Sequence, residues 1–181
     1  MPQNRTRKLV ITGVMGAITV LLGVTHWGFI PWFGGISLTI MHVPVIIAAI
    51  LEGPIVGLGV GLIFGIFSMI QAAVAPTSPA DVWFTNPVLS ILPRLFIGPV
   101  AYYVWKLFEK IPVVGLIVSG IAGSLTNTIL VLGVIGLMGL LPWPVLGGII
   151  ISNGLLEAGV SAFIVLVVVA AWRQIRVGKR Q

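Results

Sequence analysis

The stretch MHVPVIIAAILEGPIVGLGVGLIFGIFSMIQ, residues 41–71, decides the fold. It predicts two apolar helices joined by a tight turn at Glu52-Gly53-Pro54, because proline fixes φ, lacks an N–H and so suits the first turn of a new helix. From this turn glycines recur at every fourth position, at Gly53, Gly57, Gly61 and Gly65. On a helix this row forms a smooth groove that another backbone can approach closely. The groove packs either within one bundle or against a partner or a substrate.

The composition of the whole chain is that of an integral membrane protein. Of the 181 residues, 58% are hydrophobic and 8% are charged, whereas a soluble domain has about 25% charged residues. The basic residues lie mostly at the ends of apolar segments, so we expect no nucleic-acid binding. The absence of cysteine excludes disulfides and thiolate metal sites. The pattern G-x-x-x-x-G-K-[ST] is also absent, and we expect no ATP-binding module.

The apolar segments predict an all-α integral membrane protein with six transmembrane helices in one compact bundle. The first segment lacks a small-residue cleavage site, so we expect it to be a span and not a removable signal peptide. We divide the chain into a basic lead (1–8), a six-helix membrane domain (9–172) and a basic tail (173–181). The expected spans are residues 9–24, 38–51, 55–74, 88–107, 113–140 and 145–172. The second is shorter than the roughly 20 residues that cross a bilayer, so we expect neighbours or a deep entry loop to assist it.

The distribution of Lys and Arg predicts the orientation in the membrane. Nine of the ten basic residues lie in the lead, the turn after the fourth span and the tail. With six spans these three segments share one side, which the positive-inside rule makes cytoplasmic. We therefore expect both termini in the cytoplasm.

Three ionisable residues, Arg94, Glu157 and Glu52, lie within or beside the spans. A charge at mid-membrane costs at least about 2.5 kcal/mol, so it should be paired or face a cavity. Arg94 and Glu157 either form a structural pair or contact a ligand, and a free Arg94 would suit an anionic substrate. Glu52 is more simply a helix-start carboxylate.

Uncharged polar and aromatic residues gather on the predicted outer side. Such a set suggests an outward-facing pocket with aromatic walls and a few polar contacts. Interhelical hydrogen bonding is the simpler alternative for the amides. His42 is expected to be a hydrogen-bonded interface residue, and no metal site, cofactor or nucleophile–base pair is predicted. The set comprises Gln71, Asn86, Asn127, Asn153, Trp27, Trp32, Trp83 and Trp143.

The arrangement resembles the substrate-binding (S) component of energy-coupling factor (ECF) vitamin transporters over nearly the whole chain. The resemblance rests on the basic start with small residues in the first span, and on two longer stretches. These are TIMHVPVIIAAILEGPIVGLGVGLIFGIFSMIQ (39–71) and NPVLSILPRLFIGPVAYYVWKLF (86–108). The pattern is most similar to pantothenate-type members, with cobalamin, riboflavin or another vitamin as alternatives.

This resemblance implies a non-enzymatic component of an ATP-driven importer in the prokaryotic cell membrane. Such a component captures a vitamin at the extracellular face and associates with a membrane-embedded coupling protein and two ATP-binding subunits. Small residues of the first span would contact the coupling protein, here Gly13, Gly16 and Ala17. The candidate substrate-binding residues are Trp27, Trp32, His42, Gln71, Trp83, Asn86, Arg94, Asn127, Asn153 and Glu157.

Two other classes of function stay open at this point. A standalone ion-coupled secondary transporter would use Glu157 or Asp81 as its coupling carboxylate. A membrane scaffold would bind no ligand, and its outer polar residues would affect stability alone.

Overall fold

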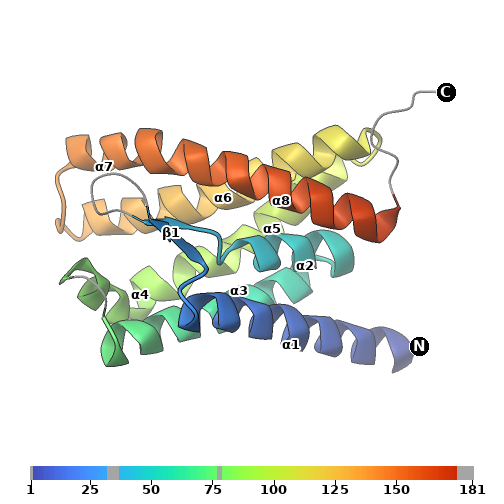
Figure 1. The fold of residues 1–181 in the computed structure, drawn as a ribbon, viewed down its shortest axis with the longest axis horizontal. Coiled ribbons are helices and arrows are strands. Elements are labelled where there is room, and N and C mark those ends of the chain that lie inside the picture. Colours follow the sequence, from blue (N-terminus) through green and yellow to red (C-terminus); the bar gives the residue numbers. More distant parts are fainter. Residues whose placement is uncertain (1, 32–36, 77–78, 175–181) are drawn as a thin grey trace.

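Helices make up almost the whole fold, which confirms the helical prediction. The computed structural model describes residues 2–31, 37–76 and 79–174, so the predicted site residue Trp32 lies outside the described residues. Figure 1 shows the helices running back and forth along one long axis. They are α1 (Pro2–Val24), α2 (Val43–Glu52), α3 (Pro54–Val74), the 3-10 helix η2 (Pro79–Thr85), α4 (Pro87–Ser90), α5 (Leu92–Leu107), α6 (Pro112–Leu137), α7 (Trp143–Ile149), the π-helical turn η3 (Ile150–Gly154) and α8 (Leu155–Arg173).

The short helix α2 is the centre of the bundle. It contacts α1, α3, α5, α6 and α8, and all its residues from Val43 to Ile50 are buried. A helix that is apolar on every side belongs in an interior. Other helices surround this short span, in agreement with the expectation that its neighbours assist it.

The glycine row of α3 packs inside the bundle, against α5. A Cβ atom on Gly57 would lie 2.9 Å from Cα of Gly98. A Cβ on Gly61 would overlap the carbonyl oxygen of Arg94, and Gly65 likewise meets the backbone just before α5. The groove thus brings the backbones of α3 and α5 together. These three glycines pack within the bundle and not against a partner or a substrate.

Gly53, the first glycine of the row, has a different role. It ends α2 and begins α3 with φ +102°, a region that side chains with a Cβ rarely adopt. A Cβ at this position would meet nothing within 4 Å. Gly53 is therefore required by the turn and not by packing.

A short β-hairpin, which the sequence did not predict, connects α1 to α2. Strand β1 (Phe29–Pro31) pairs with the antiparallel strand β2 (Ser37–Thr39) in the register Phe29 to Thr39. Strand β2 contacts α8, and Figure 1 shows the hairpin lying across the bundle beside the start of α2. The entry loop to α2 is thus an ordered element within the described residues.

Several predicted spans differ from the observed helices. The second, expected at residues 38–51, is helical only over Val43–Glu52, because its first residues belong to strand β2 and the turn after it. Helix α1 begins at Pro2, so the basic residues of the lead belong to its first turns. The fourth span is divided at Ile91 into α4 and α5, because Pro93 lacks an N–H and begins a new helix. The sixth span consists of α7, η3 and α8 in succession.

Within the described residues, five helical segments are long and apolar enough to cross a membrane, and α2 is a shorter apolar helix. The five are Arg5–Val24, Pro54–Val74, Pro87–Leu107, Pro112–Leu137 and Trp143–Arg173. The start of α1 and the end of α8 lie at the same end of the molecule (Figure 1). We call this the basic end, because it holds Arg7, Lys106 and Arg173. The opposite end, with η2 and α7, we call the hairpin end, because the hairpin precedes the start of α2 on that side of the molecule (Figure 1).

Candidate functional site

Arg94 is buried in the first turn of α5 without a carboxylate partner. Its exposed fraction is 6%, and its Nη1 donates a hydrogen bond of 2.6 Å to the carbonyl oxygen of Leu89. The guanidinium carbon lies 5.3 Å and 5.2 Å from the ring centroids of Phe64 and Phe84, a cation–π geometry. The Nε atom of Arg94 is buried and has no hydrogen-bond partner. A buried cation that is only partly satisfied can bind an anion.

Glu157, the possible partner of Arg94, makes other contacts. Its Oε1 accepts a hydrogen bond of 2.7 Å from the backbone N–H of Thr39. Its Oε2 accepts a weaker one of 3.3 Å from the hydroxyl of Thr128. Arg7 and Glu52 form the one ion pair found among the described residues. The structural pair of Arg94 with Glu157 is therefore not formed, and Glu157 instead links α8 to β2 and α6.

His42 is fully buried at the start of α2. Its Nε2 lies 2.8 Å from the hydroxyl oxygen of Ser161, one turn along α8 from Glu157. Its Nδ1 is buried without a hydrogen-bond partner. His42 is thus hydrogen-bonded between helices, as expected, and retains one unused ring nitrogen.

Helix α6 contributes two further buried polar groups. Ser124 and Asn127 are 0% and 5% exposed, and the Oγ of Ser124 and the Oδ1 of Asn127 have no hydrogen-bond partner. Most buried polar atoms in proteins are hydrogen-bonded, and leaving one unpaired costs about 1–3 kcal/mol. We call Arg94, Glu157, His42, Ser124 and Asn127, together with the residues that contact them, the polar cluster. All of these five but Glu157 retain a buried polar atom without a partner among the described residues.

The remaining predicted residues divide into those near this cluster and those at the surface. Trp83 is half-buried on η2, the helix whose Phe84 covers Arg94. Asn153 is buried on the π-helical turn, a feature that is frequent at functional sites. Gln71 is half-buried on α3. Trp27 is 80% exposed.

Asn86 is exposed and has a structural contact. Its side chain accepts a hydrogen bond of 2.9 Å from the N–H of Val88 and so caps α4. Asn is among the residues that cap helices most effectively. The structure therefore gives Asn86 a local role at a helix start.

Sequence reasoning missed several members of the cluster. These are Thr39, Phe64, Phe84, Ser124, Thr128 and Ser161. Spacing offered a signal for two of them: Ser161 lies four residues after Glu157, and Ser124 three before Asn127, so each shares a helix face with a predicted residue.

The small residues of α1 face different surroundings. Gly13 and Ala17 are exposed, and a Cβ on Gly13 would meet nothing within 4 Å. Gly16 is buried, and a Cβ there would lie 2.6 Å from Cδ1 of Ile63 on α3. Gly16 is therefore used within the bundle, and only Gly13 and Ala17 are accessible from outside.

The chain belongs to the family of substrate-specific components of ECF transporters. The model of this family, described as "ECF transporter, substrate-specific component", matches residues 7–169. This result confirms the resemblance found in the sequence and the expectation of a transporter subunit in place of an enzyme. Together with the apolar helices, it identifies a multi-pass membrane protein.

Two relatives bear a more specific name. The chain is 28% identical to the "Pantothenic acid transporter PanT" of Lactococcus lactis subsp. cremoris over 196 residues, which cover 97% of this chain and 98% of that relative. It is 36% identical to the "Pantothenate transporter PanT" of Leuconostoc mesenteroides subsp. mesenteroides over 102 residues. The second match covers 54% of this chain and 50% of that relative.

Proposed function

We propose that the chain captures pantothenate from the extracellular side and is the substrate-binding subunit of an ATP-driven importer. The two relatives named for pantothenate support this choice of vitamin. The observation that carries the proposal is the buried guanidinium of Arg94, which has no carboxylate partner among the residues that the structure describes. A planar guanidinium recognises a carboxylate with two parallel hydrogen bonds. Pantothenate carries one carboxylate.

The rest of the vitamin is neutral and polar, with two hydroxyl groups and an amide. Three further unpaired atoms of buried residues complement such groups: Nδ1 of His42, Oγ of Ser124 and Oδ1 of Asn127. The rings of Phe64 and Phe84 flank the guanidinium and would exclude water from the ion pair, which strengthens it. Trp83 and Asn153 are candidates for outer contacts. Gln71, Trp27, Trp32 and Asn86 contribute less in this proposal.

The proposed topology has six spans, with the basic end in the cytoplasm. The five long helices and α2 make up the six. The lead, the turn after α5 and the tail carry nine of ten basic residues, which favours the cytoplasm for that end. The polar cluster around Arg94 then lies nearer the extracellular side, where a vitamin arrives.

The proposed partners are a membrane-embedded coupling protein and two ATP-binding subunits. In this proposal ATP is hydrolysed by other subunits, in keeping with a sequence that lacks the pattern of a phosphate-binding loop. The exposed small residues Gly13 and Ala17 lie four positions apart on α1, so they share one face. In a membrane such a face allows close approach of another helix, and we assign it to the coupling protein.

The test compares pantothenate with pantothenol, in which a primary alcohol replaces the carboxylate. Calorimetry on the purified chain should give tighter binding of pantothenate, and native mass spectrometry should detect the co-purified vitamin. Arg94→Gln should remove the preference for pantothenate and bring both affinities together. Equal affinity of the unaltered chain for the two compounds would contradict the role of Arg94. No binding of either compound would contradict the proposed vitamin.

A further inference from the structure

A polar cavity opens at the basic end, far from the cluster around Arg94. Its volume is about 380 Å³, and it lies between α1, α2, α5 and α8. Five of its lining residues are charged: Arg7, Glu52, Lys106, Glu109 and Arg173. The ordinary explanation for basic residues here is the orientation signal of a membrane protein. That signal requires no cavity and no fixed geometry, and this site has both.

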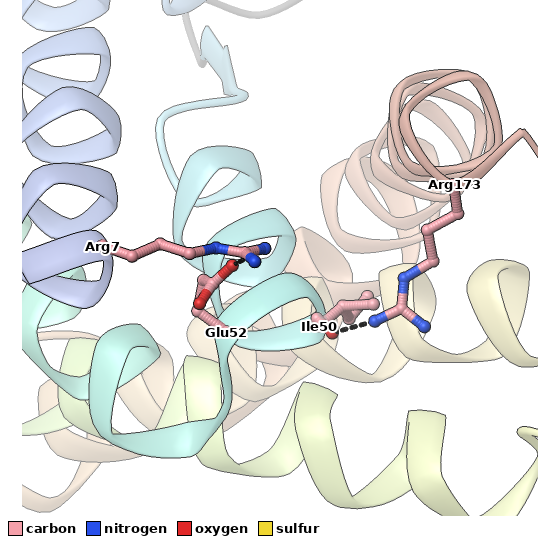
Figure 2. A network of polar contacts seen from close by, with 4 residues as sticks. All are labelled: Arg7, Ile50, Glu52 and Arg173. Carbon is pink, nitrogen blue, oxygen red and sulfur yellow. Dashed lines mark hydrogen bonds and ion pairs between the residues drawn. The ribbon is translucent and has the colours of Figure 1, made fainter. Parts of the chain in front are cut away.

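Two cations of the cavity, Arg7 and Arg173, are held in place by contacts within the chain. Arg7 forms an ion pair of 2.5 Å with Glu52. Nη2 of Arg173 donates a hydrogen bond of 2.7 Å to the carbonyl oxygen of Ile50, one of the last carbonyls of α2, which lack partners inside the helix. Figure 2 shows both contacts, with Arg7 and Arg173 approaching the end of α2 from opposite sides.

Arg173 also contacts an aromatic ring of α5. Its guanidinium carbon lies 5.0 Å from the ring centroid of Trp105, a cation–π contact. A guanidinium carries five N–H donors, and the bond to Ile50 uses one of them. Arg173 therefore has several further donors beyond the one that bonds Ile50 among the described residues.

The charges of the cavity favour an anion. Arg7 neutralises Glu52 across their ion pair, which leaves Arg173 and Lys106 against the exposed Glu109. Lys106 follows Trp105 directly in the chain and so reaches the same cavity as the fixed guanidinium. The lining thus combines a rigid fork of donors with a mobile ammonium group, a pair well suited to phosphate oxygens.

The surroundings of the cavity identify the source of the anion. Tyr103 and Trp172 are each 64% exposed and lie within three residues of the lining residues Lys106 and Arg173. Exposed aromatic residues beside basic ones mark the level of the lipid headgroups. Leu107, next to Lys106, is 77% exposed and offers an apolar surface for acyl chains.

We infer that this cavity binds the phosphate group of an anionic phospholipid, whose acyl chains lie along the apolar surfaces of α5 and α8. Basic pockets between transmembrane helices are known to accept such headgroups. The site is separate from the vitamin site and does not depend on the proposed vitamin.

The experiment measures thermal unfolding of the purified chain in nonionic detergent against three probes. These are dihexanoyl phosphatidylglycerol, dihexanoyl phosphatidylcholine and inorganic phosphate. We expect the anionic lipid to raise the Tm of the unaltered chain in a saturable way and the other two probes to leave it unchanged. Lys106→Gln should weaken the apparent affinity for the anionic lipid about fivefold, and Lys106→Gln with Arg173→Gln about thirtyfold.

Two comparisons keep the result interpretable. Because Arg173 also supports α2, each variant is referred to its own Tm without lipid, and Lys106→Gln alone leaves that support intact. The matched control is Arg5→Gln with Lys110→Gln, which removes the same charge from the basic end outside the lining. The control should retain the affinity of the unaltered chain.

Three outcomes would overturn the inference. Equal weakening in the control and the cavity variants would mean that the whole end attracts lipid by its charge. An equal response to inorganic phosphate would assign the cavity to a free anion. Loss of a co-purifying subunit from the Lys106 variant, with lipid binding unchanged, would assign the cavity to a protein partner.

Discussion

The carboxylate of Glu157 accepts a hydrogen bond of 2.7 Å from the backbone N–H of Thr39, although 118 residues separate them in the chain. The contact joins strand β2 of the hairpin to helix α8. A second contact, from the hydroxyl of Thr128, joins the same carboxylate to α6. Glu157 thus holds three elements together, and Arg94 has no carboxylate counter-ion in the described part of the chain.

The first prediction is that Arg94 and Glu157 contribute independently to stability. Since no ion pair connects them, the changes in unfolding free energy for Arg94→Gln and Glu157→Gln should add to within about 0.5 kcal/mol in the double variant. Denaturant unfolding in mixed micelles gives the unfolding free energies of the unaltered chain, the two single variants and the double variant. A double variant that is more stable than Arg94→Gln alone would mean that the two residues are paired in the folded protein.

The second prediction concerns the hairpin. Glu157→Ala removes the acceptor of the Thr39 N–H, which should lower stability by about 1–3 kcal/mol because a buried donor is left unpaired. Hydrogen–deuterium exchange should become faster for Thr39, whereas Glu157→Gln should show a smaller change because the amide keeps one acceptor oxygen. Glu109→Gln, at an exposed carboxylate, is the control. Unaltered exchange at Thr39 in Glu157→Ala would contradict the assigned contact.

The third prediction tests the glycine groove. Gly61→Ala places a Cβ against the backbone carbonyl of Arg94, so α3 and α5 must separate, and we expect a loss of about 1–3 kcal/mol from overpacking. Gly133→Ala is the matched control, because a Cβ there meets nothing within 4 Å and alanine favours a helix. Thermal unfolding should give a lower Tm for Gly61→Ala than for Gly133→Ala. Equal Tm values would mean that the groove is not tightly packed.

The fourth prediction separates two faces of α1. Gly13→Leu and Ala17→Leu should fold and bind pantothenate normally but fail to assemble with the coupling protein, because both residues are exposed. Gly16→Leu should instead lower the Tm, since its side chain would collide with Ile63. Co-purification and ligand titration on the same samples distinguish the two effects. Normal assembly of the Gly13 and Ala17 variants would remove this surface from the proposed interface.

The main elements of the fold were predictable because lipid imposes a simple rule. Apolar segments long enough to span must be helices, and Pro and Gly mark their ends, as at Pro54 and Pro112. The turn at Gly53 followed from the same reasoning. The division of the fourth span at Ile91 was less apparent, because a proline near a helix start can either bend a helix or begin a new one.

The site was only partly predictable, for a related reason. Single polar residues in apolar helices are conspicuous in a sequence, and Arg94, Glu157 and Asn127 are three such residues. Their contacts depend on the rotation of each helix about its axis and on the hairpin. The sequence contains no direct signal for the hydrogen bond from Thr39, because the donor is a backbone N–H that any residue but proline would supply.

The enclosed position of α2 has a consequence for how the protein is made. Ten residues give a helix about 15 Å long, roughly half of the 30 Å hydrocarbon layer. Such a segment cannot be released alone into lipid, because the chain around it would expose unsatisfied backbone groups. We therefore expect the insertion machinery to retain α1 and α2 until the later helices that enclose α2 have emerged. Helix α2 would then enter the membrane together with the helices that enclose it. A ribosome-bound intermediate that ends after α2 should still be held at the translocon.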